Sequence, residues 1–359
     1  MFVRVSIATL VGSVVLISAL HAQPVSALKL RRGALVAEER DTAYVAKPNA
    51  TIEAIDLASG RTLWASADAA VPLGADDRYV VAQIEEEHPD SHLRLAVLDV
   101  ENGRKISESS IELPSNVRAL VGDGLGKSFR ATVEREGNVL VVSWFFKAIP
   151  VRAMAVQPAK PHPLTLVEGT ARVNAQTGDV ISAAAASLAA IPEKWRSNGS
   201  SPRPPWRSGN IAASVDGGRG GPLTLKRSNV ATGAALPDRL LSKNAVTTIS
   251  SLDQHHLLAA ERVGAGGEED PEYRWVIFAM ETGDRITELR RDVSAGPFFL
   301  WKDNVVFESP AHGFRSGGVW VDEPLQIRAV RASSGSPVWT SELRDLEYRG
   351  PLPPGEEED

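Results

Sequence analysis

The stretch TIEAIDLASGRTLW, Thr51 to Trp64, decides the fold of this 359-residue chain. A run that alternates apolar and polar side chains ends in Asp56, a short polar turn closes on Gly60, and an aliphatic residue and Trp64 follow. Two strands joined by a tight turn need one residue at positive φ, which glycine adopts without steric cost. An Asx or hydroxyl side chain beside it can bond nearby backbone N–H groups. The stretch therefore predicts a β-hairpin.

The hairpin pattern occurs six times along the chain, the opening stretch included. In every copy a small polar residue precedes the turn glycine and an aliphatic residue stands three positions after it, whereas a Trp four positions after it occurs in two copies. A lone hairpin cannot bury its apolar face, so we expect the apolar residues of both arms to face a neighbouring sheet. The turn glycines are Gly60, Gly103, Gly178, Gly233, Gly283 and Gly335.

The spacing of these glycines, 43 to 75 residues, sets the size of the repeating unit. A blade of four antiparallel strands takes about 40–50 residues. We therefore predict an all-β fold, a β-propeller of four-stranded antiparallel blades with six blades. Seven blades remain the alternative, because the long interval between Gly103 and Gly178 could hold a degenerate blade. We favour loop insertions, one near 149–166 and one near 191–210, since both stretches are rich in Pro and other turn residues.

The repeat resembles that of the pyrroloquinoline-quinone (PQQ)-like β-propellers, the quinoprotein alcohol-dehydrogenase-like superfamily. Its pattern is A-x-D-x-x-[ST]-G-x-x-x-W, and the resemblance extends from about Gly33 to Arg344. In that family the Trp of each motif docks one blade on the next, so it marks architecture and not chemistry. The first copy matches the pattern at Ala54, Asp56, Ser59, Gly60 and Trp64.

The resemblance supports the fold but not the binding of the family's cofactor. Enzymes of the family hold PQQ with a Ca²⁺ ion, a catalytic Asp and often a vicinal Cys pair. This chain has no Cys, and none of its residues can be matched to the Ca²⁺ ligands or the catalytic Asp. We therefore expect no bound cofactor and name no catalytic or cofactor-binding residue. The expected function is a scaffold for protein–protein or ligand binding, like the non-enzymatic repeat proteins of the family. The alternative is an enzyme, either a PQQ-dependent dehydrogenase or a hydrolase or lyase with carboxylates at the channel mouth.

The two ends of the chain differ from the repeats between them. Arg4 precedes an apolar run that ends near Leu20, and small residues follow, which predicts a signal peptide over 1–27 with cleavage after Ala22 or Ala27. A retained membrane anchor is the alternative. We expect one propeller domain over 28–350, whose first strands join the C-terminal segment in a composite blade, and a flexible acidic tail over 351–359.

The charge of the chain and its predicted export indicate which kinds of partner to expect. The formal net charge is −6 and Lys and Arg are scattered, which argues against nucleic-acid binding and against a polybasic membrane patch. We expect a periplasmic or extracellular protein with no stable membrane insertion after signal cleavage. Its partner is expected to be another exported or envelope protein.

Four side chains outside the repeat pattern are candidates for binding. His88 and His92 lie in the cluster EEEHPDSH and could bind a metal through imidazole and carboxylate ligands, although a charged loop is the alternative. Trp195 and Trp206 lie in the second insertion, where we expect loops. Trp is favoured at interface hot spots, so both are candidate partner-binding residues, and the alternative is that they cover the protein's own core.

Overall fold

The computed structural model describes residues 27–344 with several gaps, and statements about the structure refer to these residues. The signal peptide predicted over 1–27 lies outside them except for Ala27, the predicted tail over 351–359 lies outside them, and so does most of both insertions. The gaps are residues 32, 85–88, 90, 119–125, 150–164, 193–194, 196–204, 218–221, 244–245, 251–254, 264–271, 292–297, 310–311 and 317–318.

The first three sheets take their strands in chain order, and neighbouring strands are antiparallel. The first sheet has five strands: β1 (Ala27–Arg31), β2 (Ala34–Ala37), β3 (Thr42–Ala46), β4 (Ile52–Asp56) and β5 (Thr62–Ser66), with the 3₁₀ turn η1 (Glu38–Arg40) between β2 and β3. The second sheet has β6 (Val71–Ala75), β7 (Tyr79–Gln83), β8 (His92–Asp99) and β9 (Lys105–Glu112). The short helix α1 (Ser115–Arg118) leads to the third sheet, with β10 (Gly126–Glu136), β11 (Val139–Ile149), β12 (Thr165–Asn174) and β13 (Val180–Ser187).

The other three sheets repeat this arrangement. The fourth has β14 (Trp206–Ser208), β15 (Ile211–Gly217), β16 (Leu223–Asn229) and β17 (Ala235–Ser242). The fifth has β18 (Val246–Ser250), β19 (His256–Val263), β20 (Glu272–Ala279) and β21 (Arg285–Arg291). The sixth has β22 (Phe298–Trp301), β23 (Asn304–Ser309), β26 (Gln326–Arg331) and β27 (Pro337–Glu342), and a hairpin of β24 (His312–Ser316) and β25 (Val319–Glu323) is inserted between β23 and β26.

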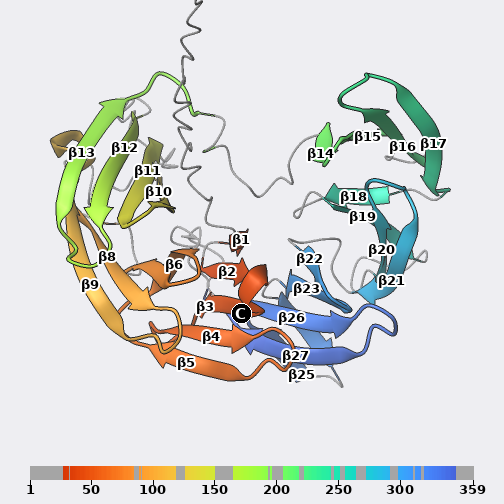
Figure 1. Ribbon diagram of the computed structural model, residues 1–359. Helices are drawn as coiled ribbons and strands as arrows, with labels where there is room; N and C mark the ends of the chain where they lie inside the picture. Colours follow the sequence, from red (N-terminus) through yellow and green to blue (C-terminus); the bar gives the residue numbers. More distant parts are fainter. Residues whose placement is uncertain are drawn as a thin grey trace, which may run out of the picture.

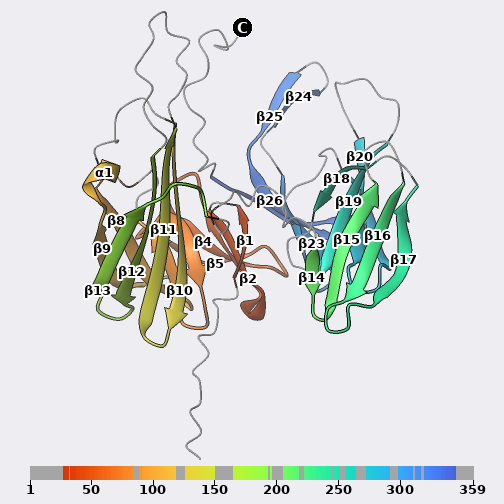
Figure 2. The same ribbon diagram turned by 90° about the horizontal axis from the view of Figure 1, so that it is seen from above.

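The six sheets stand around a common centre, which confirms the predicted six-bladed propeller architecture (Figure 1). Their order in space is fourth, fifth, sixth, first, second, third, so the third and fourth sheets lie at the two ends of an arc and are set further apart than other neighbours (Figure 1). Figure 2 shows the β24–β25 hairpin projecting beyond the end of the sheets. Apolar clusters fill the spaces between neighbouring sheets, for example between the second and third.

The repeated hairpins are the two outer strands of each sheet, and their turns have the geometry that the sequence predicts. All six turn glycines adopt φ between 68° and 78°. In the first sheet the Asp56 Oδ1 atom accepts hydrogen bonds from the backbone N–H of Ser59, at 2.8 Å, and from its hydroxyl, at 2.7 Å. The Asx residues Asp99, Asn174 and Asn229 accept the equivalent backbone bonds in the next three sheets, from the N–H groups of Asn102, Thr177 and Thr232.

One residue in each sheet, three positions before the turn glycine, links the outer hairpin to the rest of the fold. We call it the pivot residue. Its backbone N–H donates to a carbonyl in the turn between two inner strands, at 2.7–3.1 Å in all six sheets. This bond fixes the position of the outer hairpin relative to the inner strands. The pivot residues are Leu57, Val100, Ala175, Val230, Met280 and Ala332.

The backbone carbonyl of the pivot residue accepts a hydrogen bond from the neighbouring sheet. The residue four positions after a turn glycine reaches across and donates to it: Trp64 Nε1 to Val100 at 2.9 Å, Trp339 Nε1 to Leu57 at 2.8 Å. The two Trp residues therefore dock sheets as the resemblance implies. Where Trp is absent, a hydroxyl makes the same bond: Ser107 Oγ donates to Ala175 at 2.7 Å, and Thr287 Oγ1 donates to Ala332.

The contact between the fourth and fifth sheets uses a substitute donor. Pro237 occupies the docking position there, and its side chain has no hydrogen-bond donor. Arg227 on β16 replaces it: its Nη1 donates to the Glu281 carbonyl at 2.6 Å and its Nη2 to the Pro237 carbonyl at 2.9 Å. The guanidinium thus joins the two sheets through main-chain oxygens.

Between the third and fourth sheets this contact is not made: the docking residue of the third sheet and the pivot residue of the fourth are both at the surface. Ser182 occupies the docking position of the third sheet and is exposed, and the pivot residue Val230 of the fourth sheet is 41% exposed. The corresponding docking residues of the closed contacts, such as Trp64 and Ser107, are at most 9% exposed. The ring of sheets is therefore open at this point.

One expectation about the sheets is wrong for most of the repeats. Of the aliphatic residues three positions after the turn glycine, Leu63, Ile106, Ile181 and Ile286 do not face the neighbouring sheet, since they are 37–57% exposed. Val338 in the sixth sheet does pack against a buried apolar cluster. Successive strand residues point to opposite faces, so the fourth position is turned inward and the third outward. The expected composite blade is not tested, because only Arg344 of the C-terminal segment is among the described residues. The first sheet takes its five described strands from residues 27–66, and the Arg344 N–H donates to the Ala46 carbonyl at 2.9 Å.

Candidate functional site

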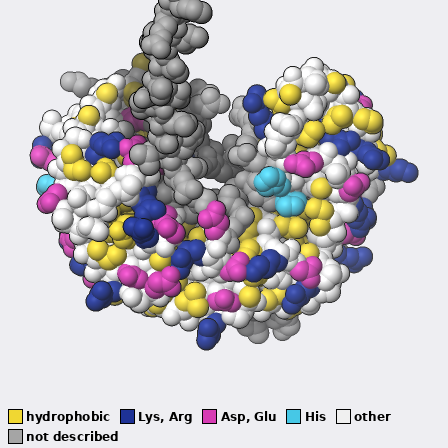
Figure 3. Space-filling model, viewed as in Figure 1, with side chains coloured by type: hydrophobic (Ala, Val, Ile, Leu, Met, Phe, Trp, Pro, Cys, Tyr) yellow, Lys and Arg dark blue, Asp and Glu magenta, His cyan; other side chains and the backbone are white. Residues whose placement is uncertain are grey.

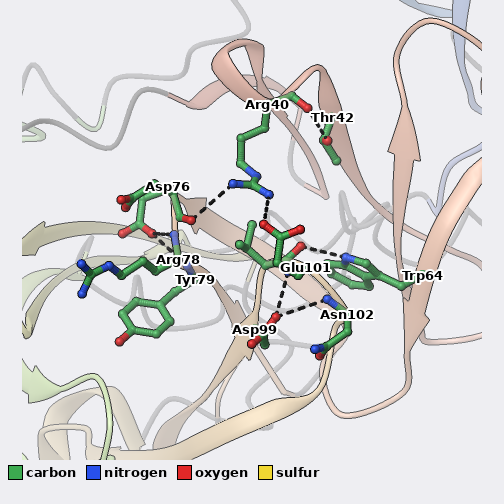
Figure 4. Close-up of polar contacts among 11 residues, drawn as sticks. Arg40, Thr42, Trp64, Asp76, Arg78, Tyr79, Asp99, Glu101 and Asn102 are labelled. Carbon is green, nitrogen blue, oxygen red and sulfur yellow. Dashed lines mark hydrogen bonds and ion pairs between the residues drawn. The ribbon is translucent and has the colours of Figure 1, made fainter.

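A polar cluster joins the first three sheets where the turns between their strands meet. Figure 4 shows the part of it that lies in the first and second sheets. Arg40, in the η1 turn of the first sheet, donates through Nη2 to Glu101 Oε1 of the second sheet at 2.5 Å. Its Nη1 also reaches the backbone carbonyl of Asp77 at 3.3 Å. The first sheet is thereby tied to two turns of the second.

Arg135, at the end of β10 in the third sheet, approaches the same turn of the second sheet from the other side. Its Nε lies 2.7 Å from Asp76 Oδ2, and its Nη2 lies 2.7 Å from Asp77 Oδ1. The guanidinium carbon lies 5.9 Å from the centre of the Tyr79 ring. Two carboxylates and an aromatic ring therefore hold this side chain in one orientation.

Asp76 organises the turn that both arginines contact. Its Oδ1 accepts backbone N–H bonds from Arg78 at 2.7 Å and from Tyr79 at 2.8 Å. The other carboxylate oxygen is left for Arg135. One side chain thus shapes the β6–β7 turn and anchors the neighbouring sheet to it.

Burial and charge change the acidity of two groups beside the cluster. Burial alone would lower the pKa of Arg40, but the hydrogen bond and charge of Glu101 raise that pKa above its ordinary value. Burial raises the pKa of Tyr44 to about 12, and the nearby charge of Arg40 offsets that rise only in part. Both groups keep their protons near neutral pH, so the cluster has a fixed charge pattern there.

A pocket of about 410 Å³ lies next to this cluster, lined by Arg78, Arg135, Gly137, Asn138 and Gln176. The β6–β7, β10–β11 and β12–β13 turns bring these residues together. Figure 4 shows the Arg78 side chain pointing away from the Arg40–Glu101 pair. Within the described part of the chain no carboxylate contacts the Arg78 guanidinium, which is exposed. The lining thus combines two cations with two amide side chains, a set suited to holding groups that accept hydrogen bonds.

The structure places both candidate Trp side chains inside the protein. Trp195 is 5% exposed, stacks on Phe145 with ring centres 5.7 Å apart, and donates through Nε1 to Glu168 Oε1 at 2.7 Å. Trp206 is 4% exposed and begins β14, so its expected place in a loop is wrong. These positions favour the alternative that both rings cover local core, and their role in partner binding stays a prediction.

The histidine candidates are not brought together with other ligands. His92 begins β8, is exposed, and its Nδ1 lies 2.8 Å from the Ser91 hydroxyl oxygen. His88 lies outside the described residues. Within the part of the chain that the structure covers, no group of three or more His, Asp or Glu residues has the arrangement of a metal site.

One face of the protein has mixed charge. Figure 3 shows acidic and basic side chains interspersed over this face, rather than one extended basic area of the kind typical of nucleic-acid-binding proteins. None of the helices among the described residues has the length and apolar character that crossing a membrane requires.

Sequence reasoning missed Arg78 and Arg135, the two cations of the pocket. They are 57 positions apart in different repeats, and their proximity depends on which sheets are neighbours. A signal was present: Arg78 and Asn138 each stand directly before an inner strand and accept the pivot N–H bond through their backbone carbonyls, from Val100 and Ala175. Alignment of the inner turns, in addition to the glycine turns, would have brought Arg78 and Asn138 to the same position in the repeat, with Arg135 three positions before Asn138.

No protein-family model matches the chain, and no curated protein sequence matches it. Solved structures do. The crystal structure of BamB from Moraxella catarrhalis is 15% identical over 91% of this chain and 80% of that one, with a TM-score of 0.24. A europium-containing methanol dehydrogenase is 9% identical over 89% of this chain and 72% of its own, with a TM-score of 0.28. The WD40 domain of SCAP from fission yeast is 12% identical over 87% of this chain and 63% of its own, with a TM-score of 0.27. The fold assignment rests on the sheets themselves, and no residue role is transferred from these proteins.

Proposed function

We propose that this chain is a non-catalytic, exported scaffold that binds a protein partner through the end of the propeller where the pocket lies. One observation carries the proposal: Arg78 is exposed at a pocket whose neighbouring cations, Arg40 and Arg135, are each held by carboxylates. An exposed arginine beside a rigid rim is the kind of anchor that protein interfaces favour. The other expected properties, a cleaved signal peptide and a single domain over 28–350, belong to the same proposal.

The rigidity of the rim supports a binding role. Arg135 of the third sheet forms ion pairs with Asp76 and Asp77 in the β6–β7 turn, and Arg40 of the first sheet donates to the Asp77 carbonyl. The pivot N–H bonds of Val100 and Ala175 fix the adjoining turns at 3.1 and 3.0 Å. A surface that is already ordered loses little conformational entropy when a partner binds. Binding energy is then available for affinity rather than for ordering the site.

The first test is native mass spectrometry on the protein purified from the exported fraction of its own host. A stoichiometric protein partner is the expected result. A bound mass that matches a quinone plus Ca²⁺, with substrate turnover, would overturn the scaffold proposal in favour of a quinoprotein dehydrogenase.

The second test uses a surface variant and a matched control. Arg78→Ala should lose at least tenfold in partner affinity with an unchanged melting temperature, because the side chain is exposed. Arg207→Ala removes an exposed arginine from β14 of the fourth sheet and should leave affinity unchanged. Equal affinities for the two variants would place the interface elsewhere.

A further inference from the structure

The charge of the pocket lining differs from that of the whole chain. The five lining residues include two arginines and no carboxylate, whereas the chain has a formal net charge of −6. A cation in a net acidic protein is a local feature and not a consequence of composition. The pocket is therefore suited to a ligand that brings negative charge to Arg78.

Arg135 is oriented for a ligand as well as for the fold. Asp76 and Asp77 contact its Nε and Nη2 atoms, and neither contact uses Nη1, which keeps its own two N–H donors. The side chain is 20% exposed and lines the pocket. Because its orientation is fixed beforehand, a ligand oxygen that meets Nη1 does not have to immobilise a flexible arginine.

The remaining lining residues favour a peptide over a nucleic-acid backbone. The amides of Asn138 and Gln176 can each donate and accept hydrogen bonds, so they complement a main-chain amide, which also does both. The phosphodiester backbone of a nucleic acid offers acceptors only, so it would leave the oxygens of both amides without a donor. The carboxylates beside the pocket, Asp76, Asp77 and Glu101, are paired with Arg135 and Arg40, so a ligand carboxylate can meet Arg78.

We infer that this pocket binds an acidic peptide segment, with a side-chain carboxylate on the Arg78 guanidinium and the adjoining main chain against Asn138 and Gln176. The inference rests on the proposed scaffold function and names the chemistry that it recognises. Two sources of such a segment exist: a partner protein, and residues 355–359 of this chain, whose sequence is GEEED.

The test measures fluorescence polarisation with two labelled, C-terminally amidated peptides, Gly-Glu-Glu-Glu-Asp and Gly-Gln-Gln-Gln-Asn, on the full-length protein. The acidic peptide should bind at least tenfold more tightly than the neutral one, and its affinity should fall as salt rises. Arg78→Ala should lose at least tenfold, and Arg78→Lys should fall between, because lysine keeps the charge without the bidentate geometry. Arg207→Ala is the control and should bind as the unaltered protein does.

A second experiment distinguishes the two sources of the acidic segment, a partner protein and residues 355–359 of this chain. A full-length variant whose Glu356, Glu357, Glu358 and Asp359 are replaced by Gln, Gln, Gln and Asn should bind the acidic probe more tightly if the chain's own tail competes. Unchanged binding assigns the site to a partner. Either result supports an acidic-peptide site.

Three results would overturn the inference: equal binding of the two peptides, equal binding to Arg78→Ala and the unaltered protein, or displacement of the probe by sodium phosphate well beyond sodium chloride of the same ionic strength. The scaffold proposal can fail separately. If a native partner is captured but the acidic probe does not displace it, the scaffold stands and the ligand class is wrong.

Discussion

Two of the turn glycines allow the energetic cost of a clash between neighbouring sheets to be measured separately from the cost of backbone strain. Gly178 and Gly233 occupy the same position in their repeats and have φ of 78° and 68°. A Cβ at Gly178 would lie 2.0 Å from the Glu108 carbonyl oxygen of the second sheet, whereas a Cβ at Gly233 would have nothing within 4 Å. Alanine at either position therefore has the cost of the left-handed conformation, and alanine at Gly178 alone adds the cost of a clash with the neighbouring sheet.

The shared cost is the left-handed conformation, about 1–2 kcal/mol for a residue with a Cβ. Gly178→Ala must also move the second sheet away from the third by more than an ångström, since the clashing atom belongs to the backbone. Overpacking of this kind costs typically about 1–3 kcal/mol. We expect a loss of about 1–2 kcal/mol for Gly233→Ala and about 2–5 kcal/mol for Gly178→Ala.

Urea unfolding followed by tryptophan fluorescence measures both free energies by linear extrapolation. Gly137→Ala is a control within the third sheet, because its φ is 63° and a Cβ there would also have nothing within 4 Å. It should behave as Gly233→Ala does. Equal losses at Gly178 and Gly233 would refute the reasoning, because they would show that the approach of the second sheet imposes no constraint on the turn.

Three further outcomes can be tested in the same way. Trp339→Phe keeps most of the ring but removes the donor to the Leu57 carbonyl, and should lower the free energy of unfolding by about 1–2 kcal/mol. The hydrogen bonds from Ser59 lower the pKa of Asp56, so its ionised form stabilises the folded state. The difference in stability between the unaltered protein and Asp56→Ala should be full at neutral pH and shrink as pH falls below about 4, through the folded-state pKa; a constant difference would contradict this. Because burial raises the pKa of Tyr44 to about 12, an absorbance titration should show this side chain ionising near that pH, and Tyr44→Phe should remove that step. Stability should fall as pH rises from about 10, where the unfolded chain ionises, towards that value, and less so in Tyr44→Phe.

The turns could be predicted from sequence because their determinants are local. A positive-φ glycine and an Asx or hydroxyl side chain act within about five residues, so Asp56, Ser59 and Gly60 suffice to specify a hairpin wherever it occurs. The docking position could not be recognised in the same way. Its residue types, among them Trp64, Ser107 and Thr287, share only a hydrogen-bond donor that meets a backbone carbonyl, and any donor of suitable length can do so.

The pocket was beyond local reasoning for a different reason. Its cations, Arg78 and Arg135, belong to different repeats, and only the order of sheets in space brings their turns together. Trp206 shows a third kind of limit. It begins a strand of three residues within a Pro- and Ser-rich stretch, which is too short to show the alternation by which strands are recognised.

The open point in the ring makes the protein a linear array rather than a closed circle. Each sheet packs on its spatial neighbours, so the array runs from the fourth sheet through the sixth and first to the third (Figure 1). In such an array the end units have one neighbour and the inner units have two, and local unfolding begins at the ends. The joint that Trp339 and Leu57 make between the sixth and first sheets lies in the interior of the array. Amide exchange should therefore be fastest in sheets from the middle of the sequence and slowest where the first and last repeats meet.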